Sequence, residues 1–270
     1  MRADAEALRA ELEAAGGSVN AGTIVPEALA VRGVGDPSVL DVVASGRASP
    51  QDEASQAVAE AVVGAVLRAR GEDGHSVVVD LAAAPGGKAC AIAERLPGRS
   101  MIVAADIAQQ RLRWVTDAIA RLDLTNVVVL CSDGSRLGLR DGVADAVLVD
   151  APCSGLGVLR RRPESRWRIE QGDLGAMAER QRALLVEGAR VLRHGGTLVY
   201  SVCTLSDEET LDIDSWLARE HGELEAIRIV DAPWRDHGRG SLLLPTDAGT
   251  DGMYVLALQK STAIPAGTLG

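Results

Sequence analysis

The sequence predicts an α/β fold with a mostly parallel, doubly wound sheet and a small N-terminal subdomain. Short runs of Val, Ile, Leu and Ala alternate with segments of helical pattern, which is typical of parallel strands joined by right-handed crossovers. Hydrophobic residues make up 47% of the chain, but aromatic residues make up only 2% and Phe is absent. A core of Ala, Val, Leu and Ile suits strands that are buried on both faces.

The expected elements follow one another in chain order. An Ala- and Glu-rich segment predicts a helix over 4–15, which Gly16-Gly17 ends, and short apolar stretches broken by glycine and proline fill 18–50. Further helices are expected over 52–70, 88–96, 108–122 and 173–193, the last of which stops at His194-Gly195-Gly196. Strands are expected over 77–79, 101–105, 127–130, 146–149, 197–202, 226–230 and 253–259. The pattern predicts an N-terminal subdomain or arm at 1–50, a catalytic domain at 51–260 and a flexible tail at 261–270.

Composition argues against several classes of protein. The formal net charge of −10 disfavours a protein that attracts nucleic acid through its overall charge, although a local basic stripe could still do so. The four cysteines have neither CxxC spacing nor nearby histidines, so no metal site is expected. No segment has the length of a membrane span and the acidic start is not a signal peptide, which predicts a cytoplasmic protein with reduced thiols and no membrane partner.

A glycine-rich loop follows the first expected strand, and an acidic residue follows each of the next two. Gly86 and Gly87 allow a ligand to approach the backbone, and the next helix offers free N–H groups. Asp106 lies about 20 residues beyond the loop, where a carboxylate can bind ribose hydroxyls, and Asp133 could contact a base edge. Together these groups favour S-adenosylmethionine as the cofactor.

Other interpretations of the glycine loop are weaker. A Walker A loop requires Gly at position 82 and Ser or Thr at position 89, but both residues are Ala, and the dinucleotide pattern GxGxxG is absent. A purely structural glycine turn, with Asp106 as a strand-end cap, stays an alternative for the loop taken alone.

Two cysteines follow the fourth and fifth strands. Cys153 stands in Asp150-Ala151-Pro152-Cys153-Ser154-Gly155, and Cys203 stands in Tyr200-Ser201-Val202-Cys203-Thr204. A thiolate that adds to C6 of cytosine makes C5 nucleophilic toward a methylsulfonium, after which a base removes the C5 proton and the thiol leaves. Asp150 could bind the N3/N4 edge of the base and stabilise the protonated adduct. This chemistry does not choose which cysteine attacks. Cys90 and Cys131 are expected to be small buried hydrophobes.

Several segments in combination resemble the NOL1/NOP2/Sun family of RNA cytosine-C5 methyltransferases. The nearest branch is similar to the bacterial small-subunit rRNA enzyme called Sun or Fmu, and the likeness covers roughly residues 5–260. The matching segments are Asp80–Lys88, Asp150–Gly157, Val158–Pro163 with Trp167, Ser201–Thr204 followed by Glu208-Glu209, Gln51–Gln56 and Asp251–Tyr254.

The resemblance implies a Rossmann-like methyltransferase sheet of about seven strands. It also implies that Cys203 is the nucleophile and that Cys153 assists release of the methylated base. The cofactor contacts that it implies are Ala82, Ala83, Ala84, Pro85, Gly86, Gly87, Lys88, Asp106, Asp133 and Asp150.

The chain departs from the family pattern in three places. Ala82 replaces a residue that is usually Cys, and Thr210 stands where Asn is common. Sun-type enzymes usually carry a NusB-like RNA-binding domain before the region matched here. We therefore expect either a fragment or a protein that binds RNA through residues 1–50 and a basic loop.

A basic stripe follows the Cys153 segment. Residues 160–168 contain five Arg, one Glu and one Trp, which predicts phosphate contact with base stacking, although most charge runs are only solvated faces. The residues expected to bind RNA are Arg160, Arg161, Arg162, Arg166 and Trp167. We expect an S-adenosylmethionine-dependent RNA cytosine-C5 methyltransferase that acts on small-subunit rRNA. The alternatives are a methyltransferase of the same fold acting on a small molecule or protein, and a non-catalytic cofactor-binding factor, against which both thiols and Asp150 argue.

Overall fold

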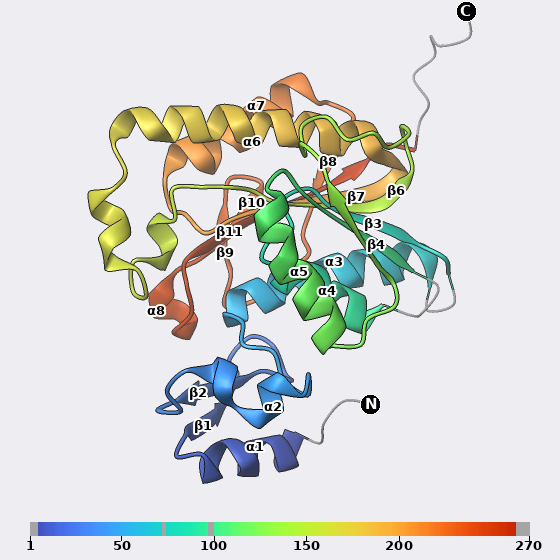
Figure 1. The fold of residues 1–270 in the computed structure, drawn as a ribbon. Helices are drawn as coiled ribbons and strands as arrows, with labels where there is room; N and C mark the ends of the chain where they lie inside the picture. The colour runs from blue at the N-terminus through green and yellow to red at the C-terminus, as the bar shows by residue number, and fades with distance from the viewer. Residues whose placement is uncertain (1–4, 72–73, 97–99, 263–270) are drawn as a thin grey trace, which may run out of the picture.

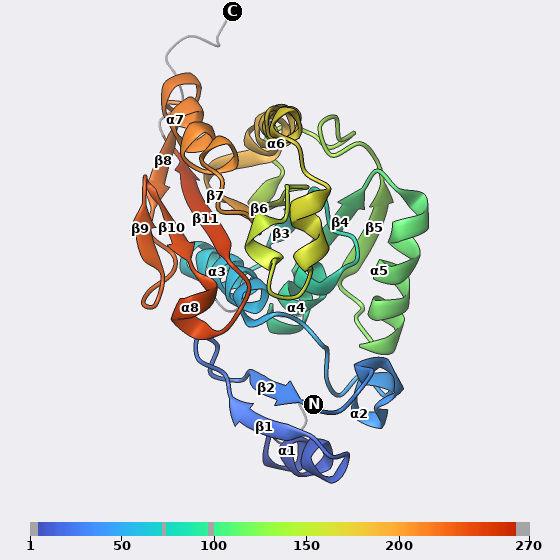
Figure 2. The same ribbon diagram turned by 90° about the vertical axis from the view of Figure 1, so that its left-hand side faces the viewer.

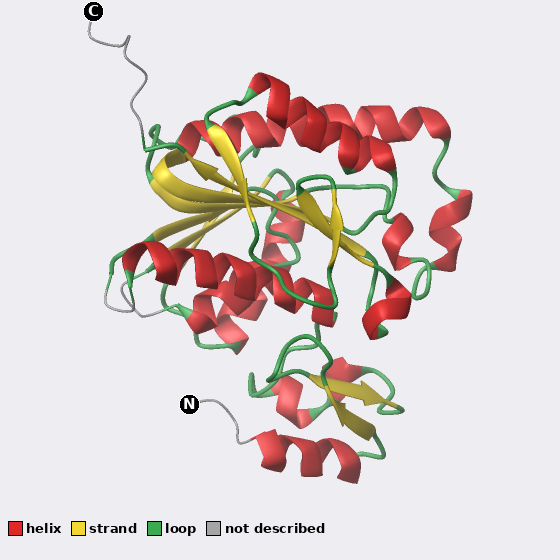
Figure 3. Cartoon of the chain, turned by 180° about the vertical axis from the view of Figure 1, so that it is seen from behind, coloured by secondary structure: helices red, strands yellow, loops and turns green. Residues whose placement is uncertain are grey.

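The computed structural model describes residues 5–71, 74–96 and 100–262 (Figure 1). Apart from its first two residues, the expected tail at 261–270 lies outside this range. Within the described residues, one large sheet is enclosed between two layers of helices, and a small N-terminal unit lies beside this body (Figure 3). The predicted α/β class is confirmed.

The large sheet has a parallel half and an antiparallel half. Its strands are β3 (Val77–Asp80), β4 (Met101–Asp106), β5 (Val127–Cys131), β6 (Ala144–Asp150), β7 (Leu192–Val202), β8 (Leu224–Ile227), β9 (Arg235–His237), β10 (Gly240–Leu243) and β11 (Met253–Lys260). The order is β5-β4-β3-β6-β7-β11-β10-β9, with β8 also paired to β11. Strands β3 to β7 run parallel to one another, whereas β11 pairs antiparallel with β7, β8 and β10. Because β4 and β6 flank β3 on opposite sides, the crevice for a ligand lies at the carboxyl ends of these strands.

Helices cover both faces of this sheet (Figure 2). One layer holds α3 (Glu53–Arg70), α4 (Gly87–Arg95) and α5 (Gln109–Arg121), and the other holds α6 (Gln171–Val191) and α7 (Leu211–Glu220). The short α8 (Pro245–Ala248) lies between β10 and β11 in the chain. Ala54, Val58 and Val62 of α3 are fully buried at a spacing of four residues, which is the stripe that a helix presents to a sheet. The side chain of Asp52 caps this helix by accepting the N–H of Ala54 at 3.1 Å.

The N-terminal unit has a small apolar cluster of its own. It contains α1 (Ala5–Ala14), the antiparallel pair β1 (Ser18–Ala21) and β2 (Leu29–Arg32), and α2 (Asp41–Ala44). Leu12, Val19, Val42 and Val43 form the cluster. Arg121 of α5 joins the unit to the main body, since its Nη1 donates to the carbonyl oxygens of Val43 at 2.8 Å and Ala48 at 3.0 Å.

The junction of α6 and β7 differs from the prediction. The helix ends at Val191, and His194-Gly195-Gly196 lies inside β7 rather than after a helix. Between the pairs Ala144–Leu192 and Ala146–Thr197 the register shifts, so β7 bulges, and Gly195 takes a φ of 71° there. The glycines therefore allow a bulge in β7. From the sequence alone, the same glycines look like the end of a helix.

Two further differences concern the last third of the chain and one cysteine. The sheet has nine strands within the described residues, rather than about seven, because the short hairpin β9–β10 lacks the apolar run on which strand prediction depends. The strand expected over 226–230 ends at Ile227. Cys131 is exposed at the end of the outer strand β5, so its prediction as a buried hydrophobe is wrong, whereas Cys90 is buried.

Candidate active site

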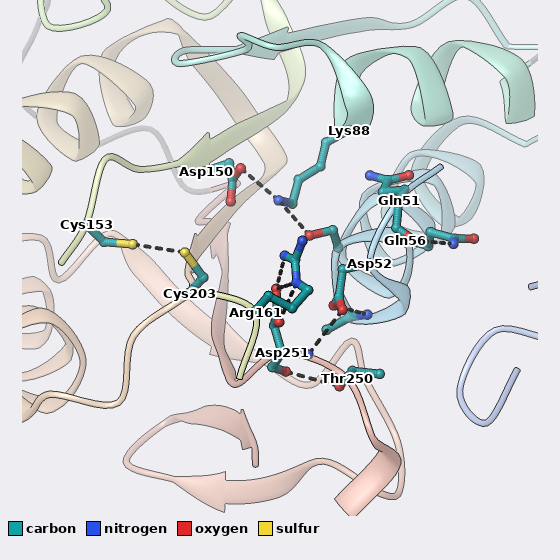
Figure 4. A network of polar contacts seen from close by, with 12 residues as sticks. Gln51, Asp52, Gln56, Lys88, Asp150, Cys153, Arg161, Cys203, Thr250 and Asp251 are labelled. Carbon is teal, nitrogen blue, oxygen red and sulfur yellow. Dashed lines mark hydrogen bonds and ion pairs between the residues drawn. The ribbon is translucent and has the colours of Figure 1, made fainter. Parts of the chain in front are cut away.

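The parallel pairing of β6 and β7 brings the two predicted cysteines together. Asp150 pairs with Ser201 in the ladder, so the loops that leave both strands start side by side. Cys153 Sγ and Cys203 Sγ lie 3.3 Å apart, and both thiols are free and half-buried (Figure 4). Residues 50 positions apart in the chain thus form one two-sulfur site.

The surroundings of the two sulfurs favour a thiolate on Cys203. A hydrogen bond from Cys153 lowers the pKa of Cys203, and the charge of Lys88 lowers it further, against the opposing effects of burial and of Asp150. The same hydrogen bond, burial, the charge of Cys203 and, after these, the charge of Glu209 raise the pKa of Cys153. Of the two sulfurs, Cys203 is therefore the one whose surroundings favour the thiolate, and these surroundings favour Cys153 as the donor of the shared hydrogen bond.

Lys88 and Asp150 form a half-buried ion pair beside the sulfurs. Lys88 Nζ donates to Asp150 Oδ2 at 2.7 Å and to Ser55 Oγ at 3.3 Å, and Ser201 Oγ donates to Asp150 Oδ1 at 2.7 Å. Burial lowers the pKa of Lys88, but the charge and hydrogen bond of Asp150 more than reverse this, so the ammonium form is favoured. Asp150 keeps 32% of its side chain exposed, which leaves it within reach of a ligand.

The glycine loop passes over the carboxyl end of β3 and turns into α4. Gly86 is the N-cap of the helix and has a left-handed φ of 108°, which suits glycine. Ala83 N donates to Ala105 O at 2.8 Å, which ties the loop to β4. The N–H groups in the first turn of α4 lie beyond the intrahelical ladder and can bind an anionic ligand group.

Two predicted acidic residues lie at the ends of β4 and β5. Asp106 is 2% exposed, and it accepts the N–H groups of Ala108 at 2.8 Å and Ala84 at 3.2 Å. Arg111 Nη2, which sequence reasoning missed, lies 3.3 Å from its Oδ2. Oδ1 of Asp106 accepts one described bond, so a lone pair stays available for a hydroxyl. Asp133 is exposed, and hydrogen bonds from Ser135 lower its pKa.

Arg161 differs from the other predicted RNA-binding residues because it forms an ion pair with a buried carboxylate. Its guanidinium forms an ion pair with Asp251, which is 2% exposed, through Nε at 2.9 Å and through Nη2. Below it, Gly157 N donates to Cys203 O at 2.9 Å, and Gly252 N donates to Gly157 O at 2.8 Å. A Cβ on Gly157 would lie 2.2 Å from Gly252 O, so the close approach of these two backbone segments requires glycine at position 157. Arg161 thus fastens the segment after Cys153 to the segment beside Cys203.

The other members of the basic stripe face solvent. Arg160, Arg162, Arg166 and Trp167 are all exposed, and Trp167 has 78% of its surface accessible. The guanidinium carbon of Arg166 lies 4.6 Å from the centre of the Trp167 ring. An exposed indole with cations around it can stack on a base and bind phosphate.

Sequence reasoning missed several residues that surround the sulfurs. Ser55 hydrogen-bonds Lys88, and Asp52 accepts Asp251 N at 3.1 Å, so the start of α3 lies against the site (Figure 4). Burial and the charge of Asp251 raise the pKa of Asp52. The sequence did contain a signal for these residues, because Gln51–Gln56 and Asp251–Tyr254 are among the segments that resemble the family. No local pattern, however, shows which residues they contact.

The described residues contain neither a cluster of metal-binding side chains nor a helix suited to crossing a membrane. Among residues 5–71, 74–96 and 100–262, no group of three or more His, Cys, Asp or Glu side chains could hold a metal ion. Over the same ranges, no helix combines the length and the apolar character that a membrane crossing requires.

Comparison with known proteins gives consistent matches. The family model described as 16S rRNA methyltransferase RsmB/F matches residues 66–259. Ribosomal RNA small subunit methyltransferase B of Vibrio cholerae is 33% identical over 96% of this chain and 56% of its own length. The Pseudomonas putida protein of the same name is 36% identical over 90% of this chain and 52% of its own length. The chain thus spans little more than half the length of these relatives.

Solved structures show the same architecture over nearly the whole chain. PH0851 superposes with a TM-score of 0.88 at 30% identity, covering 96% of this chain and 57% of that one. NSun6 from Pyrococcus horikoshii with SFG gives a TM-score of 0.73 at 31% identity, covering 88% of this chain and 60% of that one. The Rossmann-like fold expected from the sequence is therefore confirmed.

Proposed function

The chain belongs to the RsmB/F family of 16S rRNA methyltransferases, and we propose that it methylates C5 of a cytosine in small-subunit ribosomal RNA. One observation carries the proposal: Cys153 Sγ and Cys203 Sγ lie 3.3 Å apart beside the Lys88–Asp150 ion pair. We further propose that the protein works in the cytoplasm, where ribosomal RNA is found and thiols stay reduced.

The residues at the carboxyl ends of β3 and β4 fit S-adenosylmethionine. The side-chain-free backbone at Gly86 and Gly87 and the first turn of α4 suit its carboxylate, and Asp106 keeps a lone pair for a ribose hydroxyl. Ile107 is 67% exposed beside Asp106 and offers an apolar surface to a base. When bound, S-adenosylmethionine supplies the methyl group on a sulfonium. The predicted contacts with S-adenosylmethionine from residues 82–88, Asp133 and Asp150 remain predictions.

The two thiols support a division of labour. Cys203 attacks C6 as the thiolate, and the bond that forms there makes C5 nucleophilic. Asp150 faces the site with an exposed edge and can bind the N3/N4 edge of cytosine, while Lys88 holds its orientation. After C5 has gained the methyl group, its proton leaves to a base, the C5–C6 double bond reforms, and the C6–sulfur bond breaks to return the Cys203 thiolate. Cys153 assists this release.

RNA contact is proposed for the exposed part of the basic stripe. Arg160, Arg162 and Arg166 can bind phosphates while Trp167 stacks on a base. Arg161 contributes indirectly, because its ion pair with Asp251 holds the stripe in place. A local cluster of this kind can offset the acidic charge of the whole chain.

The experiment that tests the function uses labelled cofactor. The protein is incubated with S-adenosylmethionine carrying a labelled methyl group and with unmodified small-subunit rRNA, and the labelled base is mapped. We expect 5-methylcytosine with the native protein and none with Cys203→Ser. Label on another base would overturn the reaction, and label only on a protein or small molecule would favour a methyltransferase of the same fold with that substrate.

A further inference from the structure

Glu209 is a buried carboxylate that the proposed mechanism does not use. It ends the short turn Asp207–Glu209 after the Cys203 loop, and its exposed fraction is 0%. Its oxygens accept hydrogen bonds from Ser154 N at 3.0 Å, Ser154 Oγ at 2.5 Å, Gln181 Nε2 at 2.8 Å and Ser206 Oγ at 3.2 Å. Within the described residues, no cation forms an ion pair with it. A buried charge held only by neutral donors is costly, and its retention calls for an explanation.

The hydrogen bonds of Glu209 join the loops of the two cysteines. Ser154, which follows Cys153, donates to Glu209 from both its N–H and its hydroxyl, and its hydroxyl also lies 2.8 Å from Thr204 Oγ1, next to Cys203. Gln181 extends the link, since its Nε2 also donates to Pro152 O at 3.0 Å. Removing the carboxylate would free the Cys153 loop from the Cys203 loop.

Tyr200 of β7 connects this buried hydrogen-bond network to the central sheet. Its hydroxyl lies within donating distance of Gln181 Oε1 at 2.9 Å and of Glu209 O at 2.7 Å, and the ring is fully buried in β7. The support for the Cys153 loop therefore comes from the sheet itself. Such a support holds a side chain more accurately than a loop alone.

The charges around the two sulfurs are unequal. Cys153 contacts Cys203, and the other groups whose charge acts with it are Glu209 and Tyr200, neither of which is a cation. Cys203 contacts Cys153, and it is influenced by the charges of the carboxylates Asp150 and Asp251 and of the cations Lys88 and Arg161. Glu209 is hydrogen-bonded to Ser154, the residue after Cys153, so its charge favours the protonated form of Cys153 more than that of Cys203, which has Lys88 nearby.

We propose that Glu209 is a positioning residue for Cys153. Its carboxylate fixes the Cys153 loop against Cys203, and its charge keeps Cys153 as the hydrogen-bond donor of the thiol pair, so that Cys203 carries the negative charge. The catalytic meaning of this arrangement rests on the proposed function, but the arrangement itself can be tested without RNA.

The first test measures thiol alkylation. Iodoacetamide is applied from pH 6 to pH 10, and modification of Cys153 and Cys203 is followed separately by mass spectrometry of their peptides. Glu209→Gln keeps the size of the side chain but loses the charge and one of the two acceptor oxygens. In this variant we expect Cys153 to react about tenfold faster at pH 8, with its pH midpoint lowered. The matched control is Glu208→Gln, because this neighbouring carboxylate forms no described hydrogen bond or ion pair and should change neither rate.

Three results would overturn the proposal. One is an unchanged Cys153 profile in Glu209→Gln, and another is the same profile in both glutamine variants. The third is an equal rise at both sulfurs at every pH, which would mean that the loops had merely opened. Thermal unfolding of each variant shows how much of the protein is folded during the assay.

The second test links the arrangement to turnover. With cofactor and RNA, Cys153→Ser should accumulate a covalent protein–RNA complex, and Glu209→Gln should accumulate an intermediate amount because its Cys153 is displaced. If Cys153→Ser traps RNA and Glu209→Gln turns over like the native protein, the positioning role is wrong. If no variant traps RNA while the alkylation profiles shift as expected, the proposed RNA function fails and the role of Glu209 in holding the thiol pair stands.

Discussion

Strand β6 carries an aspartate near each end, and the two carboxylates are held in opposite ways. Asp145, near the amino end, is 5% exposed and accepts Arg70 Nε at 2.6 Å, Arg193 Nε at 2.5 Å and the N–H of Val77 at 2.8 Å. Asp150, at the carboxyl end, has 32% of its side chain exposed and accepts Lys88 Nζ and Ser201 Oγ, both at 2.7 Å.

The comparison indicates that Asp145 stabilises the fold, whereas Asp150 is placed to take part in chemistry. Burial would raise the pKa of Asp145, but the Val77 N–H and the two guanidinium groups overcome it and lower that pKa, so this carboxylate is held in its charged form. At the carboxyl end, Lys88 pairs with Asp150, and its charge also acts on Asp80. Burial and the charge of Asp150 raise the pKa of Asp80 to about 7. At this edge of the sheet, two carboxylates thus share one cation, and the two thiols lie at the same edge.

The largest effect should come from the thiols at the carboxyl end. Cys203→Ser should lower methyl transfer at least about a thousandfold, because a hydroxyl at neutral pH supplies almost no attacking anion. The assay follows labelled methyl transfer to RNA. Asp145→Asn is the control from the other end of β6 and should leave transfer per folded molecule within about twofold. If Cys203→Ser trapped RNA and Cys153→Ser did not, the roles of the two cysteines would be reversed.

The next effect concerns the pH dependence of stability at the carboxyl end. Because the pKa of Asp80 is raised to about 7 in the folded state, the folded protein binds a proton more tightly than the unfolded chain. Stability from this proton is present at low pH and is lost as the pH rises from about 4 to about 7. Relative to Asp80→Asn, the free energy of unfolding of the native protein should fall by up to about 4 kcal/mol across this window. Urea unfolding at several pH values measures this difference, and parallel curves would contradict the prediction.

The amino end should show the opposite dependence and a smaller effect. The lowered pKa of Asp145 gives stability that is present above about pH 4 and is lost as the pH falls further. Asp145→Asn should lower the free energy of unfolding at pH 7 by about 2 kcal/mol, because the Arg70 and Arg193 bonds lose their charged acceptor. Asp141→Asn is a matched control, since its side chain is 80% exposed in its pair with Arg190 and should change stability by less than about 0.5 kcal/mol. Equal losses in both variants would remove the contrast between a buried and a surface pair.

The smallest effect is expected from the basic stripe. Replacing Arg160 and Arg162 with Ala should weaken RNA binding and flatten the slope of log K against log salt by about 1.4, or about 0.7 for each lost phosphate contact. Arg161→Ala should leave that slope unchanged and lower the thermal midpoint, because Arg161 is paired with Asp251. Filter binding at several salt concentrations distinguishes the two. A change of slope in Arg161→Ala would show that this residue does contact phosphate.

The sequence alone determined much of this protein, because the relevant signals are local. The alternation of apolar runs and helical segments predicted the α/β fold, and the elements from α3 to β6 begin and end within about two residues of their expected limits. Cys153, Cys203 and Asp150 were identified as strand-end residues from their neighbours in the chain. Family resemblance then added roles that residue chemistry had left open.

Only the tertiary structure decided which of these groups meet. The register of Asp150 with Ser201 sets the distance between the two sulfurs, and a register one residue different would separate them. Arg161 was expected to bind RNA because it stands in a basic run, yet its partner Asp251 lies 90 residues away in the chain. The bulge in β7 and the support that Glu209 gives to Ser154 also depend on residues far apart in the chain. Periodicity and local motifs act over a few residues, whereas ion pairs and buried hydrogen bonds form between whichever groups the closed fold brings within about 3 Å.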